Sequence, residues 1–332
     1  MKTILNTLFE YQELSADQAR SILHEIAGGQ YNPAQIASFL TVYRMRPVTV
    51  EEMRGFRSAL LDLCLHIDLS DYKAIDLCGT GGDGKNTFNI STLTSFVVAG
   101  AGYKVAKHGN YGVSSVCGSS NVMERLGYRF SNQEDQIKRE LDQAGISFLH
   151  APLFHPAMKA VGPIRFELGI KTFFNMLGPL VNPSRPAYQL TGVFDLELAR
   201  LYKYILQKEG TQYTIVHALD GYDEVSLTGP FRLITPERDE IVEPDDMGFR
   251  QLKAEELFGG DTISEAAAIF TKVLSGKSTA AHNEVVLANA SLAIATLNPN
   301  LSMGECREQA ESSLLGGKAE SAFQSLIATS QP

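Results

Sequence analysis

Glycines and hydroxyl-bearing side chains gather between two apolar runs of this chain, the first ending at Leu77 and the second beginning at Leu93. Four of the six residues from 79 to 84 are glycine, so the backbone there can turn tightly and direct successive N–H groups at one anion. A helix that opens at Ser91 or Thr92 would add the unpaired N–H groups and the positive dipole end of its first turn. The stretch predicts a phosphate-binding loop, with an ordinary glycine turn after a strand as the open alternative.

The spacing of these residues matches neither of the common nucleotide-binding loops. A Walker A loop needs Ser or Thr after Gly-Lys, but Gly84 and Lys85 are followed by Asn86. The Gly-x-Gly-x-x-Gly pattern also fails, because the glycines at 79 and 81 are followed by glycines at 82 and 84. We therefore expect an anionic ligand other than ATP or NAD.

A second loop of small polar residues, 107–115, follows the next predicted strand and leads toward a predicted helix over 120–126. Lys107 offers a point charge, and hydroxyl groups such as that of Ser119 lie just before the helix. Taken alone, such a loop is more often an ordinary turn. Two of them on neighbouring strands favour an extended phosphorylated ligand.

Two adjacent carboxylates, Asp223 and Glu224, follow a third predicted strand and a turn at Asp220-Gly221-Tyr222. Carboxylates at the end of a strand suit Mg²⁺, a hard ion that prefers oxygen and often joins protein carboxylates to substrate phosphates. The alternative is a solvated turn, because Asp-Gly is a common turn pair, and for this segment alone that alternative is the stronger.

One arginine, Arg165, lies among apolar neighbours in a Gly- and Pro-rich segment, 155–183. Its planar guanidinium could bind a carboxylate at two points. A structural arginine paired with Glu167 is an equally good interpretation of the sequence. The segment interrupts the regular pattern around it, so we expect it to leave the main domain and to pack on the N-terminal helices.

Alternating strand and helix patterns from residue 73 onward are expected to position these loops. Strands are predicted at 73–77, 103–106, 146–149, 188–193 and 213–218, with helices at 93–101, 120–126, 135–144 and 196–208 and a hairpin at 231–235 and 240–242. Such alternation is typical of a mostly parallel sheet flanked by helices. Ligands of these sheets bind beyond the carboxyl ends of the strands, where all three polar loops fall.

The first 65 residues have a helical pattern. Ser15 with Gln18, Asn32 with Gln35 and Thr49 with Glu52 each match a helix N-cap with a reciprocal side chain three residues later. We expect a small helical domain over 1–70, with 163–183 inserted from the larger domain. The larger α/β domain is then expected over 71–162 and 184–332.

The 332 residues carry a net charge of −9, which argues against nucleic acid as a partner because phosphate backbones are bound by basic surfaces. Four scattered cysteines form no Cys-x-x-Cys pair, and seven histidines show no metal-binding spacing. No signal peptide or membrane span is expected, because Asn6 and Glu10 come too early and no apolar run is long enough. We expect a cytoplasmic protein with small-molecule ligands.

Several motifs together resemble the anthranilate phosphoribosyltransferase family of tryptophan biosynthesis. They cover nearly the whole chain in order: Gly79-Thr80-Gly81-Gly82-Asp83, Phe88-Asn89-Ile90-Ser91-Thr92, Lys107-His108-Gly109-Asn110, Arg165-Phe166-Glu167-Leu168-Gly169, Phe174-Asn175-Met176-Leu177-Gly178-Pro179-Leu180, Asn182-Pro183 and Asp223-Glu224. The resemblance implies a homodimer with a nucleoside-phosphorylase-like fold, a helical domain that closes over the sheet domain on a hinge, and Mg²⁺ as cofactor. It also implies that the amine of anthranilate attacks the anomeric carbon of phosphoribosyl pyrophosphate (PRPP), so that pyrophosphate leaves.

The resemblance assigns roles by position and places no nucleophile–base pair in the site, with Lys107 and Asn110 in support. It implies that PRPP is held by Gly79, Thr80, Gly82, Asp83, Thr87, Asn89, Ile90, Ser91, Thr92, Lys107 and Ser119. Anthranilate would be bound by Gly79, His108, Asn110, Arg165 and Pro179. The metal ligands would be Ser91, Asp223 and Glu224.

Three positions depart from the family pattern. Tyr111 stands where a basic residue is usual, Asn121 where Asp is usual, and Val116 where Lys or Arg is frequent. These departures concern donor binding in the second loop rather than the reaction. The nearest rival function is a pyrimidine nucleoside phosphorylase, which would share the fold and use free phosphate. A silent relative that binds nucleic acid is a further alternative, which the negative charge disfavours.

Overall fold

The computed structural model describes residues 1–112 and 116–331, which fold into two compact units. Met1–Ile67 and Ala151–Pro183 form the first, here called the helical unit. Asp68–His150 and Ser184–Pro332 form the second, the sheet unit. The excursion into the helical unit thus begins at Ala151, earlier than the predicted 163, because Leu65 N–H bonds to Phe154 O at 2.8 Å and anchors the segment there.

The helical unit is built on α1 (Lys2–Phe9), α2 (Ala16–Ala27), α3 (Pro33–Met45) and α4 (Val50–Leu63). All three predicted capping boxes are confirmed, at the starts of α2, α3 and α4. Gly55 lets α4 approach α2 closely, since a Cβ there would lie 2.2 Å from Ala16 O. In the core, the rings of Phe39, Tyr43 and Phe56 pack edge to face.

The inserted part of this unit consists of short helices: α8 (Ala151–Phe154), α9 (Gly162–Leu168) and 3₁₀ turns at Pro156–Ala160, Phe173–Met176 and Gly178–Leu180. Phe173 stacks on Phe56 of α4 with ring centroids 4.2 Å apart, which joins the insertion to the aromatic core. Arg57 Nε also donates to Leu180 O at 2.9 Å. The insertion is therefore part of the helical unit's own core.

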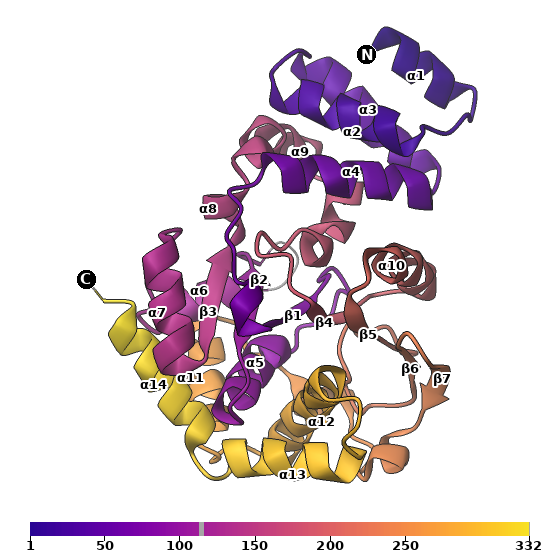
Figure 1. The fold of residues 1–332 in the computed structure, drawn as a ribbon. Coiled ribbons are helices and arrows are strands. Elements are labelled where there is room, and N and C mark those ends of the chain that lie inside the picture. The colour runs from indigo at the N-terminus through magenta and orange to yellow at the C-terminus, as the bar shows by residue number, and fades with distance from the viewer. Residues whose placement is uncertain (113–115, 332) are drawn as a thin grey trace. The chain divides into compact units, whose positions relative to one another are not determined.

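The sheet unit contains seven strands in the order β3-β2-β1-β4-β5-β6-β7 (Figure 1). These are β1 (Ile75–Gly79), β2 (Val105–Gly109), β3 (Ile146–His150), β4 (Tyr188–Gly192), β5 (Gln212–Ala218), β6 (Phe231–Ile234) and β7 (Asp239–Val242). The first five are parallel, and β6 and β7 form the predicted antiparallel hairpin. The mostly parallel sheet predicted from the alternating pattern is confirmed.

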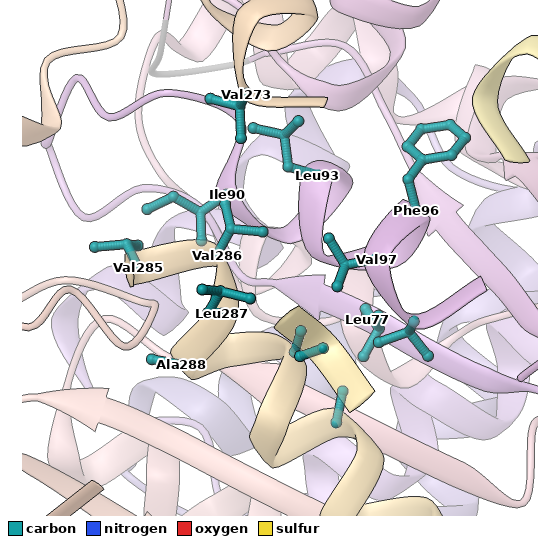
Figure 2. Packing of buried hydrophobic residues seen from close by; sticks show 14 of the residues in the cluster. Leu77, Ile90, Leu93, Phe96, Val97, Val273, Val285, Val286, Leu287 and Ala288 are labelled. Atoms are coloured by element: carbon teal, nitrogen blue, oxygen red, sulfur yellow. The ribbon is translucent and has the colours of Figure 1, made fainter. Parts of the chain in front are cut away.

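Helices flank the sheet: α5 (Ile90–Gly100), α6 (Ser119–Arg125), α7 (Glu134–Ala144), α10 (Leu196–Glu209), α11 (Ile263–Leu274), α12 (Ala280–Leu297), α13 (Met303–Leu314) and α14 (Lys318–Thr329). Short 3₁₀ turns lie at Ser70–Tyr72, Pro244–Met247 and Ala254–Leu257. Figure 2 shows Leu77 of β1 close to Val97 of α5, with Leu287 of α12 on the other side of the same apolar cluster. This packing fixes where α5 begins relative to the ends of β1.

Two boundaries differ from the prediction in ways that matter for the loops. Both β1 and β2 run on to a glycine, Gly79 and Gly109, because these residues still pair with the neighbouring strands. Helix α5 begins at Ile90 rather than at Ser91 or Thr92, since Leu93 N–H already bonds to Asn89 O at 3.0 Å. Among the described residues, no helix is long and apolar enough to cross a membrane.

Candidate active site

Three loops follow the carboxyl ends of strands in the sheet unit. The first loop, 80–89, follows β1; the second, 110–118, follows β2; and the third, 219–224, follows β5. Because β2, β1, β4 and β5 are neighbouring parallel strands, these loops share one edge of the sheet. Residues 113–115, the last three of the predicted polar stretch 107–115, lie outside the described residues.

The first loop turns through left-handed glycines. Gly81, Gly82 and Gly84 have φ angles of 64°, 79° and 74°, which side chains adopt only with strain. Asp83 Oδ1 accepts a 3.0 Å hydrogen bond from the backbone N–H of Lys85, closing a local turn. The glycine pattern therefore makes a compact turn with exposed backbone at Gly81 and Gly84.

The third loop lies directly against the first. Asp223 Oδ2 accepts a 2.6 Å hydrogen bond from the backbone N–H of Gly81. A Cβ on Gly79 would lie 2.6 Å from the same carboxylate oxygen, and a Cβ on Gly192 would lie 1.5 Å from Asp223 O. The contact requires glycine at both strand ends. Gly192 was not among the predicted site residues, because a glycine that ends a strand carries no chemical signal of its own.

The two adjacent carboxylates have unusual electrostatics. Burial raises the pKa of Asp223 well above its usual value, and the neighbouring charges of Glu224 and Asp83 add to this effect. Burial also raises the pKa of Glu224 to about 7, although the charge of Lys107 and hydrogen bonds from Ser91 oppose the rise. Neighbouring buried carboxyl groups of this kind favour a bound cation.

Ser91 and Lys107 complete this cluster. Lys107 is 1% exposed, and its Nζ donates to Leu77 O and to Ser91 Oγ, the latter at 3.3 Å. Ser91 lies in the first turn of α5, where Asn89 and not Ser91 is the N-cap, and its N–H and hydroxyl group oppose the rise in the pKa of Glu224. Ser91 and Glu224, two of the three predicted metal ligands, therefore lie near each other.

A magnesium ion fits this donor set. Ser91, Asp223 and Glu224 offer oxygen atoms, and Mg²⁺ often uses one or two carboxylates together with substrate phosphates. The described part of the chain contains no cluster of three or more His, Cys, Asp or Glu side chains arranged to hold a metal ion. A cation here would therefore need oxygens from a ligand or from water to complete its coordination.

A buried acidic residue in β1, for which no role was predicted, holds the end of β2 just before the second loop. Asp76 in β1 is 0% exposed, and its Oδ1 accepts a 3.0 Å hydrogen bond from His108 N–H. His108 is itself 3% exposed. Asp76 could have been identified from the sequence, because it is a carboxylate inside an apolar strand pattern, and a buried carboxylate needs a hydrogen-bond partner in the core.

The departures from the family pattern lie on this loop and in α6, which follows it, and two of them have clear structural contacts. Asn121 Oδ1 accepts hydrogen bonds from Gly112 N–H and Gly118 N–H, at 2.9 and 3.0 Å. Tyr111 packs edge to face on His150, with ring centroids 4.9 Å apart. Val116 is exposed, and nothing in the structure explains it.

The other predicted PRPP residues lie in the same loops or in the first turn of the helix that follows each loop. Asn110 O accepts from Ser119 Oγ at 3.3 Å, and Asn89 Nδ2 donates to Cys117 O at 2.9 Å, which joins the first and second loops. Ile90 and Thr92 are buried, at 2% and 1% exposed. Of the remaining predicted residues, Gly82 has a left-handed backbone and Thr80 is partly exposed. Thr87 forms an isolated antiparallel β-bridge with Phe258.

Arg165 and Pro179 belong to the helical unit, in α9 and in the turn at Gly178–Leu180. Arg165 Nη2 donates to Asn175 Oδ1 at 3.2 Å, and the guanidinium lies 5.3 Å from the ring centroid of Phe174. Burial lowers the pKa of Arg165 below its usual value. In the described ranges its side-chain partners are Asn175 and Phe174, and an ion pair with Glu167 is not among them.

Comparison with known families gives consistent matches along both units. Residues 71–320 match the model described as "Glycosyl transferase family, a/b domain", and residues 2–64 match "Glycosyl transferase family, helical bundle domain". The chain is 60% identical over 326 residues to anthranilate phosphoribosyltransferase of Flavobacterium johnsoniae, covering 98% of each chain. It is 54% identical to that of Cytophaga hutchinsonii, covering 98% of this chain and 100% of the relative.

Solved structures of the same enzyme are also similar. Anthranilate phosphoribosyltransferase from Thermus thermophilus superposes with a TM-score of 0.92 at 29% identity, covering 99% of both chains. The enzyme from Saccharomyces cerevisiae, solved in complex with PRPP and Mg, gives a TM-score of 0.90 at 29% identity, covering 98% of this chain and 96% of that one. The yeast enzyme in complex with 4-fluoroanthranilate gives 0.87 at 27% identity, with the same coverage.

Proposed function

The chain belongs to the anthranilate phosphoribosyltransferase family, and we propose that its sheet-edge loops and Arg165 carry out this family's reaction. The enzyme transfers the phosphoribosyl group of PRPP to the amine of anthranilate, the second step from chorismate in tryptophan biosynthesis. It is thus a pentosyltransferase within the glycosyltransferases. The observation that best supports the proposed site is the contact of Asp223 with Gly81, which joins the carboxylate loop to the glycine loop.

The chemistry needs positioning and charge stabilisation more than proton transfer. The aromatic amine of anthranilate is already a nucleophile, so no strong base is required. As the bond to pyrophosphate breaks, positive charge develops at the ribose and negative charge on the leaving group, and fixed donors stabilise that charge. The glycine N–H groups of the first loop and the first turn of α5 are such donors.

We assign the donor-binding roles accordingly. Gly79, Thr80, Gly82, Asp83, Thr87, Asn89, Ile90, Ser91, Thr92, Lys107 and Ser119 hold PRPP. Lys107, buried beside Ser91, fixes the serine hydroxyl and contributes positive charge next to the phosphates. Ser91, Asp223 and Glu224 would hold Mg²⁺, which would neutralise charge on the departing pyrophosphate.

Anthranilate is proposed to be bound by Gly79, His108, Asn110, Arg165 and Pro179. Arg165 supplies a guanidinium without an ion-pair partner in the described residues, which suits the carboxylate of an anionic aromatic substrate. His108 is held through its backbone by Asp76, so its place in β2, just before the second loop, is fixed.

We also propose that the protein is a homodimer. The helical unit exposes large apolar side chains at Phe9 and Met45, which are 59% and 77% exposed and end α1 and α3, and α1 contacts α3. Large apolar side chains that gather into one exposed patch are typical of an interaction surface. Sedimentation equilibrium tests this proposal, and a monomer at micromolar concentration would overturn it.

A cytoplasmic location is proposed from the chemistry of the cysteines. All four, Cys64, Cys78, Cys117 and Cys306, are free thiols, which are usual in a reducing compartment. Fluorescent fusion to the chain, with its N-terminus free, tests this.

The activity is tested by mixing the protein with PRPP, Mg²⁺ and anthranilate and following the loss of anthranilate fluorescence. Loss of fluorescence that depends on both PRPP and Mg²⁺ is expected. A parallel reaction with a pyrimidine nucleoside and inorganic phosphate tests the phosphorylase alternative. Absence of turnover with anthranilate, in a protein that is folded by circular dichroism, would overturn the proposed function.

A further inference from the structure

The side chain of Asn175 accepts two hydrogen bonds within the helical unit. Its Oδ1 accepts from the backbone N–H of Thr172 at 3.0 Å, as the reciprocal residue of the capping box that starts the turn at Phe173–Met176. The same oxygen accepts from Arg165 Nη2 at 3.2 Å. One amide oxygen therefore fixes both the local turn and the guanidinium.

The turn itself does not require an amide at this position. Both of its hydrogen bonds go to the oxygen, and the carboxylate of an aspartate could accept the same two. At the third position of a capping box a side-chain oxygen accepts from the N-cap N–H, and Asn and Asp both supply such an oxygen. The difference between the two lies in charge, because only the carboxylate would form an ion pair with Arg165.

The remaining surroundings of the guanidinium are also uncharged. Phe174 lies under it at 5.3 Å, an arrangement that orients a cation without neutralising it. Burial lowers the pKa of Arg165, as expected for a charge that has lost water and has no carboxylate beside it. In the described ranges, Phe174 and Asn175 provide its only recorded side-chain partners.

We propose that Asn175 is a specificity-determining positioning residue, whose neutral amide orients Arg165 while leaving the full guanidinium charge available to the carboxylate of the acceptor substrate. This inference rests on the proposed role of Arg165 in binding anthranilate. An acidic residue at position 175 would form an ion pair with the guanidinium of Arg165. The guanidinium would then bind the substrate carboxylate more weakly, and the enzyme would lose its preference for an anionic acceptor.

The test compares anthranilate with its uncharged analogue 2-aminobenzamide in the wild type, Asn175→Asp and Asn175→Ser. Asn175→Asp should raise the KM for anthranilate by about tenfold or more and lower the preference for anthranilate over the amide by a similar factor. The KM for PRPP should stay within about twofold, because no donor-loop contact changes. Asn175→Ser keeps a neutral acceptor, so it should retain the preference even if its turnover falls.

Two results would overturn the inference. One is an unchanged preference in Asn175→Asp; the other is an equal loss of preference in the aspartate and serine variants, which would mean that amide geometry and not neutrality matters. If the aspartate variant does not fold, collapse of the preference in the serine variant alone has the same meaning. Arg165→Ala separates the two proposals: no change in its KM for anthranilate would refute the role of Arg165 itself, whereas a raised KM with an unaffected Asn175→Asp would refute only the role of Asn175.

Discussion

The carboxylate of Asp223 accepts a hydrogen bond from the backbone N–H of Gly81 at 2.6 Å, across 142 residues of sequence. This contact turns the glycine loop after β1 and the acidic loop after β5 into one structure. It depends on glycine at the ends of both β1 and β4, where any side chain would meet Asp223. The donor loop and the proposed metal ligands should therefore fail together when this contact is disturbed.

Gly79→Ala tests that dependence. Its Cβ would lie 2.6 Å from Asp223 Oδ2, so the carboxylate must move away from Gly81. We expect kcat/KM for PRPP to fall by about a hundredfold, the cost of displacing a positioned group by an ångström or so. Steady-state kinetics at varied PRPP measures the effect.

Gly229→Ala is the matched control for this substitution. No heavy atom lies within 4 Å of a Cβ at Gly229, so its kinetics should remain close to wild type. Thermal unfolding of both variants shows whether the first acts through the loop or through the fold. Equal kinetic losses in the two variants would contradict the role given to the Asp223–Gly81 contact.

The double variant Asp223→Asn with Glu224→Gln removes both proposed metal-binding charges. We expect the Mg²⁺ concentration for half-maximal activity to rise by about tenfold or more, and turnover to fall at saturating Mg²⁺. Activity is measured across a Mg²⁺ titration at fixed PRPP. Asp220→Asn, in the same loop but bonded to Thr228 Oγ1, should leave the Mg²⁺ dependence unchanged. An unaltered titration in the double variant would remove these carboxylates from the metal site.

A cation–π contact provides a second link between the same loops. Lys85 Nζ lies 4.5 Å from the ring centroid of Tyr222, the residue before Asp223. Lys85→Met and Tyr222→Leu should each destabilise the fold, with a coupling free energy of about 0.5–1 kcal/mol in a double-mutant cycle. Urea denaturation of the four proteins gives the coupling. Tyr222→Phe keeps the ring and should keep the coupling to Lys85, so strictly additive effects of Lys85→Met and Tyr222→Leu would contradict the link.

The elements were largely predictable because their signals are local. Alternating apolar patterns predicted the parallel sheet, and the three capping boxes of α2, α3 and α4 follow from pairs of residues three apart. The start of α5 was predicted one or two residues late, because serine is a residue type that often caps the start of a helix. The hydroxyl of Ser91 instead accepts a hydrogen bond from Lys107, which comes from a different strand of the sheet.

The residues proposed to bind ligands could be predicted from the sequence, but the residues that hold them in position could not. Motifs identified the glycine loop and the carboxylates, since these residue types suit phosphate and Mg²⁺. The supports are Asp76 beneath His108, Gly192 against Asp223, and Asn175 beside Arg165. Each acts through a contact that depends on the three-dimensional pairing of strands or turns, and none has a distinctive residue type.

His150, under the second loop, should make the stability of the fold depend on pH. Its Nδ1 lies 2.8 Å from Ser120 Oγ, and its ring stacks on Phe130 with centroids 4.3 Å apart. Burial lowers the pKa of His150 from 6.5 to about 4. Between these two pH values the unfolded chain binds a proton at His150 that the folded chain does not bind. The contribution of His150 to folding stability is therefore fully present above about pH 6.5 and is lost as the pH falls toward 4.

The variant His150→Gln isolates this contribution. At about pH 8 the wild type should be the more stable of the two, because glutamine loses the ring contacts with Phe130 and Tyr111. At about pH 5 the difference in unfolding free energy should shrink by about 2 kcal/mol. Only the wild type has a group at this site that is protonated in the unfolded chain and neutral in the folded chain, so only the wild type loses stability there. Urea denaturation at both pH values measures the change. His155, whose pKa burial also lowers to about 4, is present in both proteins and cancels from the comparison. A difference that stays constant between the two pH values would mean that His150 is protonated without cost in the folded protein.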